Sequence, residues 1–140
     1  MKKYRFLQHT GDAKFRAYGK SLEESFTNAA LATASLMWEW KDVKKNIQHK
    51  VKVEGNDLEQ LLVNFLEEIL YLLDSKMFLL ASVEKMNIQK KNGRYFLNAL
   101  FRGDKYSEKY KIFGDVKAIT YHQMNIKKND HFTAQVVVDI

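Results

Sequence analysis

Alternating polar and apolar residues at the start of the chain predict two short β-strands. We place them at Tyr4 to His9 and at Ala13 to Tyr18, on either side of a Thr-Gly-Asp turn. After these strands the apolar residues recur every three or four positions, which is typical of an amphipathic helix. The segment Ser21-Leu22-Glu23-Glu24 has the form of a capping box, so the helix is expected to begin there and to end near Trp38.

A second helix and several further strands follow. Asp57 is the expected N-cap of a helix whose apolar side chains run from Leu58 to Leu73. An Asn-Gly pair at Asn92 and Gly93 indicates a tight hairpin turn, and the polar segment Gly103 to Asp115 is expected to be mostly loop. The remaining strands are predicted around Val51 and Val53, at Val83 to Lys90, Arg94 to Arg102, Ala118 to Ile126 and Phe132 to Ile140.

Together these elements predict an α+β fold, in which two amphipathic helices pack on a largely antiparallel β-sheet. The chain has 140 residues, of which 46% are hydrophobic, and this suffices for a single domain spanning residues 1–140. No apolar run is long enough to cross a bilayer, so we expect no membrane span. The chain also starts without the apolar stretch of a secretion signal, and the simplest expectation is a cytoplasmic protein.

The composition excludes several kinds of chemistry. The chain has no cysteine, which rules out disulfides, thiolate metal sites and a cysteine nucleophile. It lacks a nucleophile elbow, a phosphate-binding glycine loop and a zincin helix, so catalysis by this chain alone is not supported. The net charge of +6 comes from scattered lysine pairs, a pattern more typical of a solvated surface than of a nucleic-acid site.

Two aspartates at opposite ends of the sequence are candidate metal ligands. Asp12 lies in a His-Thr-Gly-Asp turn, and Asp139 directly precedes Ile140. By the period of two, Asp139 falls on the face of the last strand opposite the most apolar one. If the fold brings the two ends together, two carboxylates and a main-chain oxygen of Ile140 converge, as Ca²⁺, Mg²⁺ or Mn²⁺ requires. Taken singly, Asp12 is most simply a turn residue and Asp139 a solvated terminal charge.

Two histidines are further candidates. His9 precedes the first turn, and His122 lies within a predicted strand. Each imidazole is able to act as a ligand, as a base or as a hydrogen-bond partner of a carboxylate. The simpler explanation for each is a partly buried ring that is satisfied by its neighbours.

Several segments, in the same order, resemble the archease family along essentially the whole chain. The family usually has alanine where this chain has Gly11, a change that loosens the turn slightly but leaves the neighbouring carboxylate intact. The stretch Gly103 to Tyr110 also departs from the family pattern. The matching segments are His9 to Asp12, Gly19 to Ala30, Glu54 to Leu62, Glu67 to Leu72, Val116 to His122 and Asp139-Ile140.

The resemblance implies an accessory protein rather than an enzyme. Archeases assist the RtcB-type RNA ligase that joins the exons of split tRNA, and they promote the ligase–guanylate intermediate, repeated turnover and use of other nucleotides. Carried onto this chain, the family's metal site is implied to consist of Asp12, Asp139 and the main-chain carboxylate or carbonyl of Ile140. Lys117 and His122, together with His9, are implied as contacts to a phosphate or to the ligase.

Two other functions remain open from the residues. A general tRNA-binding or chaperone module would use the positive charge, and would bind RNA without the ligase, with affinity that falls steeply as salt rises. A stand-alone metal-dependent hydrolase would use the same carboxylates. The sequence offers no general base or nucleophile placed for that chemistry.

Overall fold

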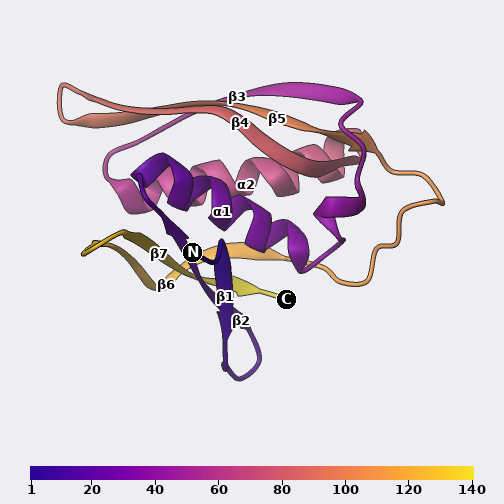
Figure 1. Cartoon of the computed structure of the whole chain (residues 1–140), viewed down its shortest axis with the longest axis horizontal. Coiled ribbons are helices and arrows are strands. Elements are labelled where there is room, and N and C mark those ends of the chain that lie inside the picture. The colour runs from indigo at the N-terminus through magenta and orange to yellow at the C-terminus, as the bar shows by residue number, and fades with distance from the viewer.

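The computed structural model describes all residues from 1 to 140 as two β-sheets with two α-helices between them (Figure 1). The helices contact strands of both sheets, so the molecule has three layers. The elements, in chain order, are β1 Tyr4–Leu7, β2 Ala13–Gly19, α1 Leu22–Ser35, the short 3₁₀-helix Trp40–Asp42, β3 Ile47–Gly55, α2 Leu58–Lys76, β4 Phe78–Lys91, β5 Arg94–Lys105, β6 Ala118–Lys128 and β7 Phe132–Asp139.

Side-chain caps fix the start of both long helices. The hydroxyl of Ser21 accepts a hydrogen bond from the Glu24 main-chain N–H at 3.0 Å, and the Glu24 carboxylate accepts from the Lys20 N–H at 2.9 Å. This is the reciprocal capping box expected from the sequence. The carboxylate of Asp57 caps α2 in the same manner, accepting from the Gln60 N–H at 2.7 Å.

The two sheets differ in how far apart in sequence their strands lie. One sheet has the order β3-β5-β4, built from the middle of the chain, and the other has the order β1-β2-β7-β6. Neighbouring strands are antiparallel in both sheets. In the second sheet the first hairpin lies directly beside the last strand, so both ends of the sequence meet at its centre.

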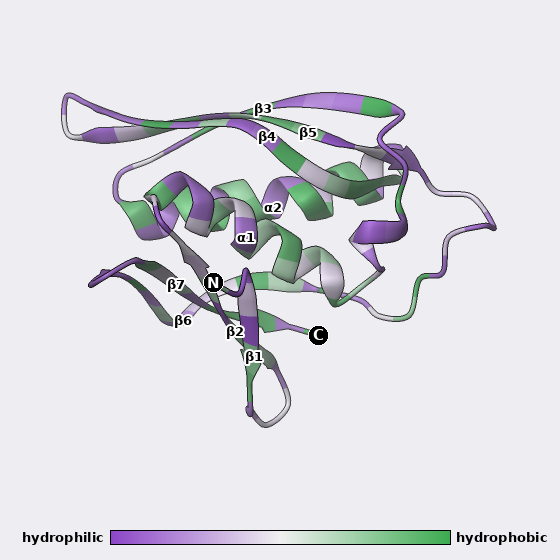
Figure 2. Cartoon of the chain, viewed as in Figure 1, coloured by the Kyte–Doolittle hydropathy of each residue, from purple (hydrophilic) through white to green (hydrophobic).

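A single cluster of 33 buried residues fills the space between the sheets. Helix α1 is buried almost all round, since strands pack on opposite sides of it, and its alanines allow close approach. In Figure 2 the helices and the strand segments beside them carry much of the green, while the tip of the β4–β5 hairpin is mostly polar. No helix of the structure is both long and apolar enough to cross a membrane.

The predicted fold class is confirmed, and the structure adds a second sheet to it. Helix α1 ends at Ser35, and the Trp38 main-chain N–H still donates to the Ala34 carbonyl oxygen at 3.0 Å, in agreement with the predicted end near Trp38. The Trp38 indole N–H donates to the Leu80 carbonyl oxygen at 2.9 Å. Helix α2 is capped by Met77 in a left-handed conformation with φ of 54°, and strand β4 starts at Phe78 directly after it.

Candidate functional site at the end of the four-stranded sheet

The β2–β7 ladder brings the two candidate aspartates beside each other. Ala13 of β2 lies opposite Val138 of β7 in the antiparallel register. Asp12 directly precedes Ala13 and Asp139 directly follows Val138, so both aspartates leave the same end of the ladder. Neighbouring strands lie about 4.8 Å apart, which places the two backbones within side-chain reach of each other. The condition for a shared site is therefore met by the fold.

The two carboxylates differ in their surroundings. The Asp12 side chain is 31% exposed, whereas Asp139 and the following Ile140 are exposed. Asp139 takes part in no ion pair of the chain. The Asp139 carboxylate is thus accessible to a ligand from solvent, while the Asp12 carboxylate is the more enclosed of the two.

Lys117 directly precedes β6 and lies at the same end of the sheet. Ala118 of β6 lies opposite Asp139, and the Lys117 main-chain N–H donates to the Asp139 carbonyl oxygen at 2.7 Å. The Lys117 ammonium group forms no ion pair within the chain. An exposed, unpaired cation beside an anionic end is free to meet a partner group of negative charge.

His9 lies between Asp12 and His122. Its Nδ1 atom is 3.8 Å from Asp12 Oδ2, and its ring centroid is 6.3 Å from that of the exposed His122. The His9 Nδ1 atom is buried and has no hydrogen-bond partner. The structure therefore brings His9 and His122 to the acidic end, and leaves a polar atom beside the carboxylate without a bond.

The chemistry of these residues fits a hard divalent cation. Asp12 and Asp139 offer carboxylate oxygens, and the main chain of Ile140 offers another oxygen next in sequence. The structure contains no cluster of three or more histidine or acidic side chains arranged for a metal ion. A cation at this end would therefore use main-chain oxygens and water for its remaining ligands, as Ca²⁺ and Mg²⁺ commonly do.

A hydrogen-bonded pair anchors the irregular segment that leads to Lys117. The Tyr110 hydroxyl donates to Asp104 Oδ2 at 2.6 Å, and Asn46 donates to the same oxygen at 3.3 Å. The bond from Tyr110 is the main cause that holds the pKa of Asp104 below its usual range. Burial, aided by the bond to Asp104, raises the pKa of Tyr110. The Phe113 N–H then donates to the Met37 carbonyl oxygen at 3.0 Å, which fixes the segment against the end of α1.

Sequence reasoning missed this anchor. The segment Gly103 to Asp115 was expected to be mostly loop, whereas β5 continues to Lys105 and only residues 106–117 are irregular. The available signal was a tyrosine six residues after an aspartate, which does not by itself indicate a contact across a loop.

Comparisons with known proteins agree along the whole length. The model of the Archease protein family matches residues 4–140. A protein archease of Methanosarcina barkeri is 41% identical, over 99% of this chain and 97% of its own length. A protein archease of Pyrococcus furiosus is 38% identical over the full length of both chains. A solution structure of a Methanobacterium thermoautotrophicum protein covers all of both chains with a TM-score of 0.85 and 32% identity.

Proposed function

The chain belongs to the archease family, and we propose that it is a metal-binding accessory protein that activates an RtcB-type RNA ligase in tRNA splicing. In this role it promotes guanylylation of the ligase, sustains multiple turnovers and broadens the nucleotides that the ligase uses. It acts in the cytoplasm and reaches tRNA through the ligase. The protein itself performs no covalent step.

One observation carries the proposal. The antiparallel register of β2 and β7 places Asp12 and Asp139 at one end of the ladder. Two carboxylates held by adjacent strands form a rigid anionic end, since each oxygen is only a few bonds from hydrogen-bonded backbone. The main-chain oxygen of Ile140 supplements them.

Some residues of the acidic end bind the cation, and others contact the partner protein or its nucleotide. Asp12 and Asp139 hold a Ca²⁺, Mg²⁺ or Mn²⁺ ion, which when bound neutralises negative charge on nucleotide phosphates. Lys117, with its free ammonium group, contacts a phosphate or a carboxylate of the ligase. His9 lies beside Asp12, with its Nδ1 atom 3.8 Å from Asp12 Oδ2, and the exposed His122 extends the contact surface.

The experiment is a guanylylation assay with purified ligase, GTP and divalent metal. Asp12→Asn and Asp139→Asn each keep the shape of the side chain but remove its charge, and each is expected to reduce stimulation about tenfold or more. Asp74→Asn is the matched control, because Asp74 is exposed on α2 and forms no ion pair. Stimulation by folded Asp139→Asn equal to that of the unchanged protein would contradict the proposal.

A general RNA-binding or chaperone function is the second candidate, and the outer face of the four-stranded sheet favours it. Arg5 and Arg16 lie opposite each other in the β1–β2 ladder, and Lys14 projects from the same face. Such a protein would bind tRNA with no ligase present, and its affinity would fall steeply between low and physiological salt. Activation of the ligase on a short RNA without tRNA structure distinguishes the first function from this one.

A further inference from the structure

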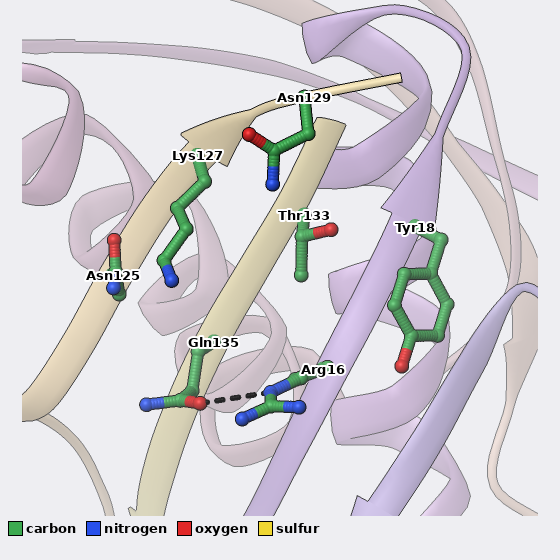
Figure 3. Close-up of a pocket in the computed structure, with 7 residues that line it drawn as sticks. All are labelled: Arg16, Tyr18, Asn125, Lys127, Asn129, Thr133 and Gln135. Carbon is green, nitrogen blue, oxygen red and sulfur yellow. Dashed lines mark hydrogen bonds between the residues drawn. The ribbon is translucent and has the colours of Figure 1, made fainter. Parts of the chain in front are cut away.

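A polar pocket of about 210 Å³ lies on the outer face of the four-stranded sheet (Figure 3), and neither Asp12 nor Asp139 lines it. It is built by β2, β7 and β6 and by the turn that joins the last two strands. The strand register arranges most of its side chains in two rows across the three strands, namely Arg16–Gln135–Asn125 and Tyr18–Thr133–Lys127.

The pocket is positively charged and contains no acidic side chain. Arg16 and Lys127 come from strands that flank β7 on opposite sides, so the pocket carries a cation on each side. None of the ion pairs in the chain includes either residue. Two cations without carboxylate partners, set side by side in one surface depression, attract an anion.

The guanidinium group of Arg16 is held in place by a relay of hydrogen bonds. Its Nε atom donates to Gln135 Oε1 at 2.9 Å, and Gln135 Nε2 donates to the Gln123 carbonyl oxygen at 2.8 Å. The two terminal amino groups of Arg16 form no hydrogen bond within the chain. A planar fork with a fixed orientation and free donors matches two oxygens of a phosphate group.

Other side chains of the pocket add donors suited to the same ligand. The Thr133 hydroxyl and the side-chain amides of Asn125 and Asn129 line the pocket, and these side-chain groups have no hydrogen-bond partner in the chain. The Tyr18 ring borders the pocket, and its centroid is 5.6 Å from that of His131. An aromatic ring beside phosphate donors offers a face on which a nucleobase stacks.

We propose that this pocket binds the phosphate group of a nucleotide, presented either as a free nucleotide or by an RNA strand. Arg16 binds two phosphate oxygens, Lys127 pairs with the charge from the opposite side, and Tyr18 contacts the base. The proposal does not depend on the metal-binding role of Asp12 and Asp139. It assigns a second ligand site to the same sheet.

The test uses the full-length protein, labelled with ¹⁵N and titrated with three probes at physiological salt. The probes are inorganic phosphate, adenosine 5′-monophosphate and a single-stranded eight-nucleotide RNA. Amide shifts are expected to be confined to residues around Arg16, Gln135 and Lys127. Saturation by the mononucleotide as tightly as by the RNA identifies a free nucleotide as the source, whereas tighter binding of the RNA identifies a strand.

Variants distinguish binding in the pocket from non-specific attraction of the ligand to the positive net charge. Arg16→Gln and Lys127→Gln are each expected to weaken binding about tenfold. Arg16→Lys keeps the charge but loses the fork, and an intermediate loss is expected. Lys50→Gln is the matched control, since it removes an exposed charge from β3 in the other sheet. The exposed Lys127 side chain makes no hydrogen bond or ion pair in the chain, so its substitution is expected to leave the fold intact and gives a test free of misfolding.

Two results would overturn the proposal. One is the absence of saturable binding of any of the three probes at millimolar concentration. The other is equal weakening by Lys50→Gln and Lys127→Gln, because that would show attraction to net charge alone. Cation binding at the aspartates is measured separately with Ca²⁺, so a failure of one site does not affect the conclusion about the other.

Discussion

The outer face of the four-stranded sheet carries opposite charge at its two ends, although the same strands build both. One end presents Asp12 and Asp139, and the other presents Arg16 and Lys127. Asp139 and Gln135 are four residues apart on β7, which corresponds to about 13 Å along a strand. This distance exceeds the Debye length of about 8 Å at physiological salt. The two ends are therefore expected to bind their ligands almost independently.

The two ends also differ in how their side chains are positioned. The aspartates are short, and their place is set by the backbone register alone. Arginine and lysine have long flexible side chains, so the basic end needs additional bonds to fix a geometry. Gln135 supplies this for Arg16. Substitutions at the acidic end should therefore remove a contact to the ligand directly. At the basic end, some substitutions should weaken binding because they disturb the position of Arg16.

The largest expected effect comes from reversing the charge at the acidic end. Asp139→Lys replaces a ligand oxygen by an ammonium group, and we expect cation affinity to fall about 100-fold or more. Stabilisation by Ca²⁺ in a thermal melt, worth about 2.7 kcal/mol at 100 times the dissociation constant, should disappear with it. Binding of adenosine 5′-monophosphate should change less than about twofold, as screening over this distance predicts.

Calorimetric titration with Ca²⁺ and with the nucleotide measures both quantities on one sample. Asp74→Lys provides the same change of charge on exposed α2 and should leave Ca²⁺ binding as it was. A large change in nucleotide affinity in Asp139→Lys would show that the ends are coupled, and the comparison between them would fail.

A smaller effect is expected where a residue positions another at the basic end. Gln135→Leu removes the acceptor of the Arg16 Nε bond and frees the guanidinium group. Nucleotide affinity should fall about fivefold, less than on loss of Arg16 itself, because the charge remains. Gln89→Leu, an exposed change on β4 of the other sheet, is the control. Unaltered nucleotide binding in Gln135→Leu would remove the positioning role, while altered Ca²⁺ binding would again indicate coupling.

The two ends were not equally predictable from the sequence. Periodicity and capping boxes identified both helices, because the signals at Ser21 and Asp57 are local. Nothing local indicates that Asp12 meets Asp139, since their pairing joins the first hairpin to the last strand. The residues made both aspartates candidates, and the resemblance to a family gave the reason to pair them. Whether they hold a metal ion remains a prediction. The segment around Tyr110 was predicted as loop, but its bond to Asp104 depends on a contact that no spacing rule describes.

The basic pocket was hidden from sequence reasoning by a bulge in β6. Thr120 pairs with Val137, but Asn125 rather than His122 pairs with Gln135, because extra β6 residues lie between these two pairs. Strand β6 gains three residues on β7 between these pairs. Because three is an odd number, β6 side chains that would face the helices by simple alternation face outward beyond the bulge. Simple alternation along β6 would therefore have placed the wrong side chains in the pocket.

A change in the loop anchor should lower the stability of the protein and leave nucleotide binding at the basic end unaffected. Tyr110→Phe removes the bond that the hydroxyl donates to Asp104 and the weaker one that it accepts from the Lys44 N–H at 3.2 Å, and should lower the free energy of unfolding at pH 7 by about 1 kcal/mol. The pKa of Asp104 is held low in the folded protein, so its contribution is present above the carboxyl's unfolded pKa of about 3.9. It is lost as the pH falls through the lower pKa of the folded state.

Urea unfolding at pH 7 and at pH 3 checks this sign. The stability difference between the two proteins should shrink at the lower pH. On the alkaline side, burial raises the pKa of Tyr110, so the bond should persist to a pH above the ordinary tyrosine range. A difference that grows on acidification would contradict this assignment. Nucleotide binding at Arg16 serves as the internal control and should be unaffected.

The smallest expected effect is that of substituting Gln123, a residue of the β6 bulge that bonds to both Lys14 and Gln135. Gln123 has a φ of 53°, its side chain accepts from Lys14 Nζ at 2.8 Å, and its carbonyl oxygen accepts from Gln135. Gln123→Gly loses an exposed bond but relieves a left-handed conformation, so the free energy of unfolding should change by less than about 0.5 kcal/mol. Gln123→Ala loses the same bond and keeps the Cβ atom, and should be less stable than Gln123→Gly by about 1 kcal/mol.

Both variants keep the carbonyl that orients Gln135, and hence Arg16. If the backbone of the bulge is what shapes the basic end, nucleotide affinity should be retained in Gln123→Gly, with Ca²⁺ affinity unchanged as well. Chemical unfolding and the two titrations measure all three quantities. A fall in nucleotide affinity in the stable glycine variant would assign the organisation of the pocket to the Gln123–Lys14 side-chain bond, and would make the middle of the face a part of the basic site.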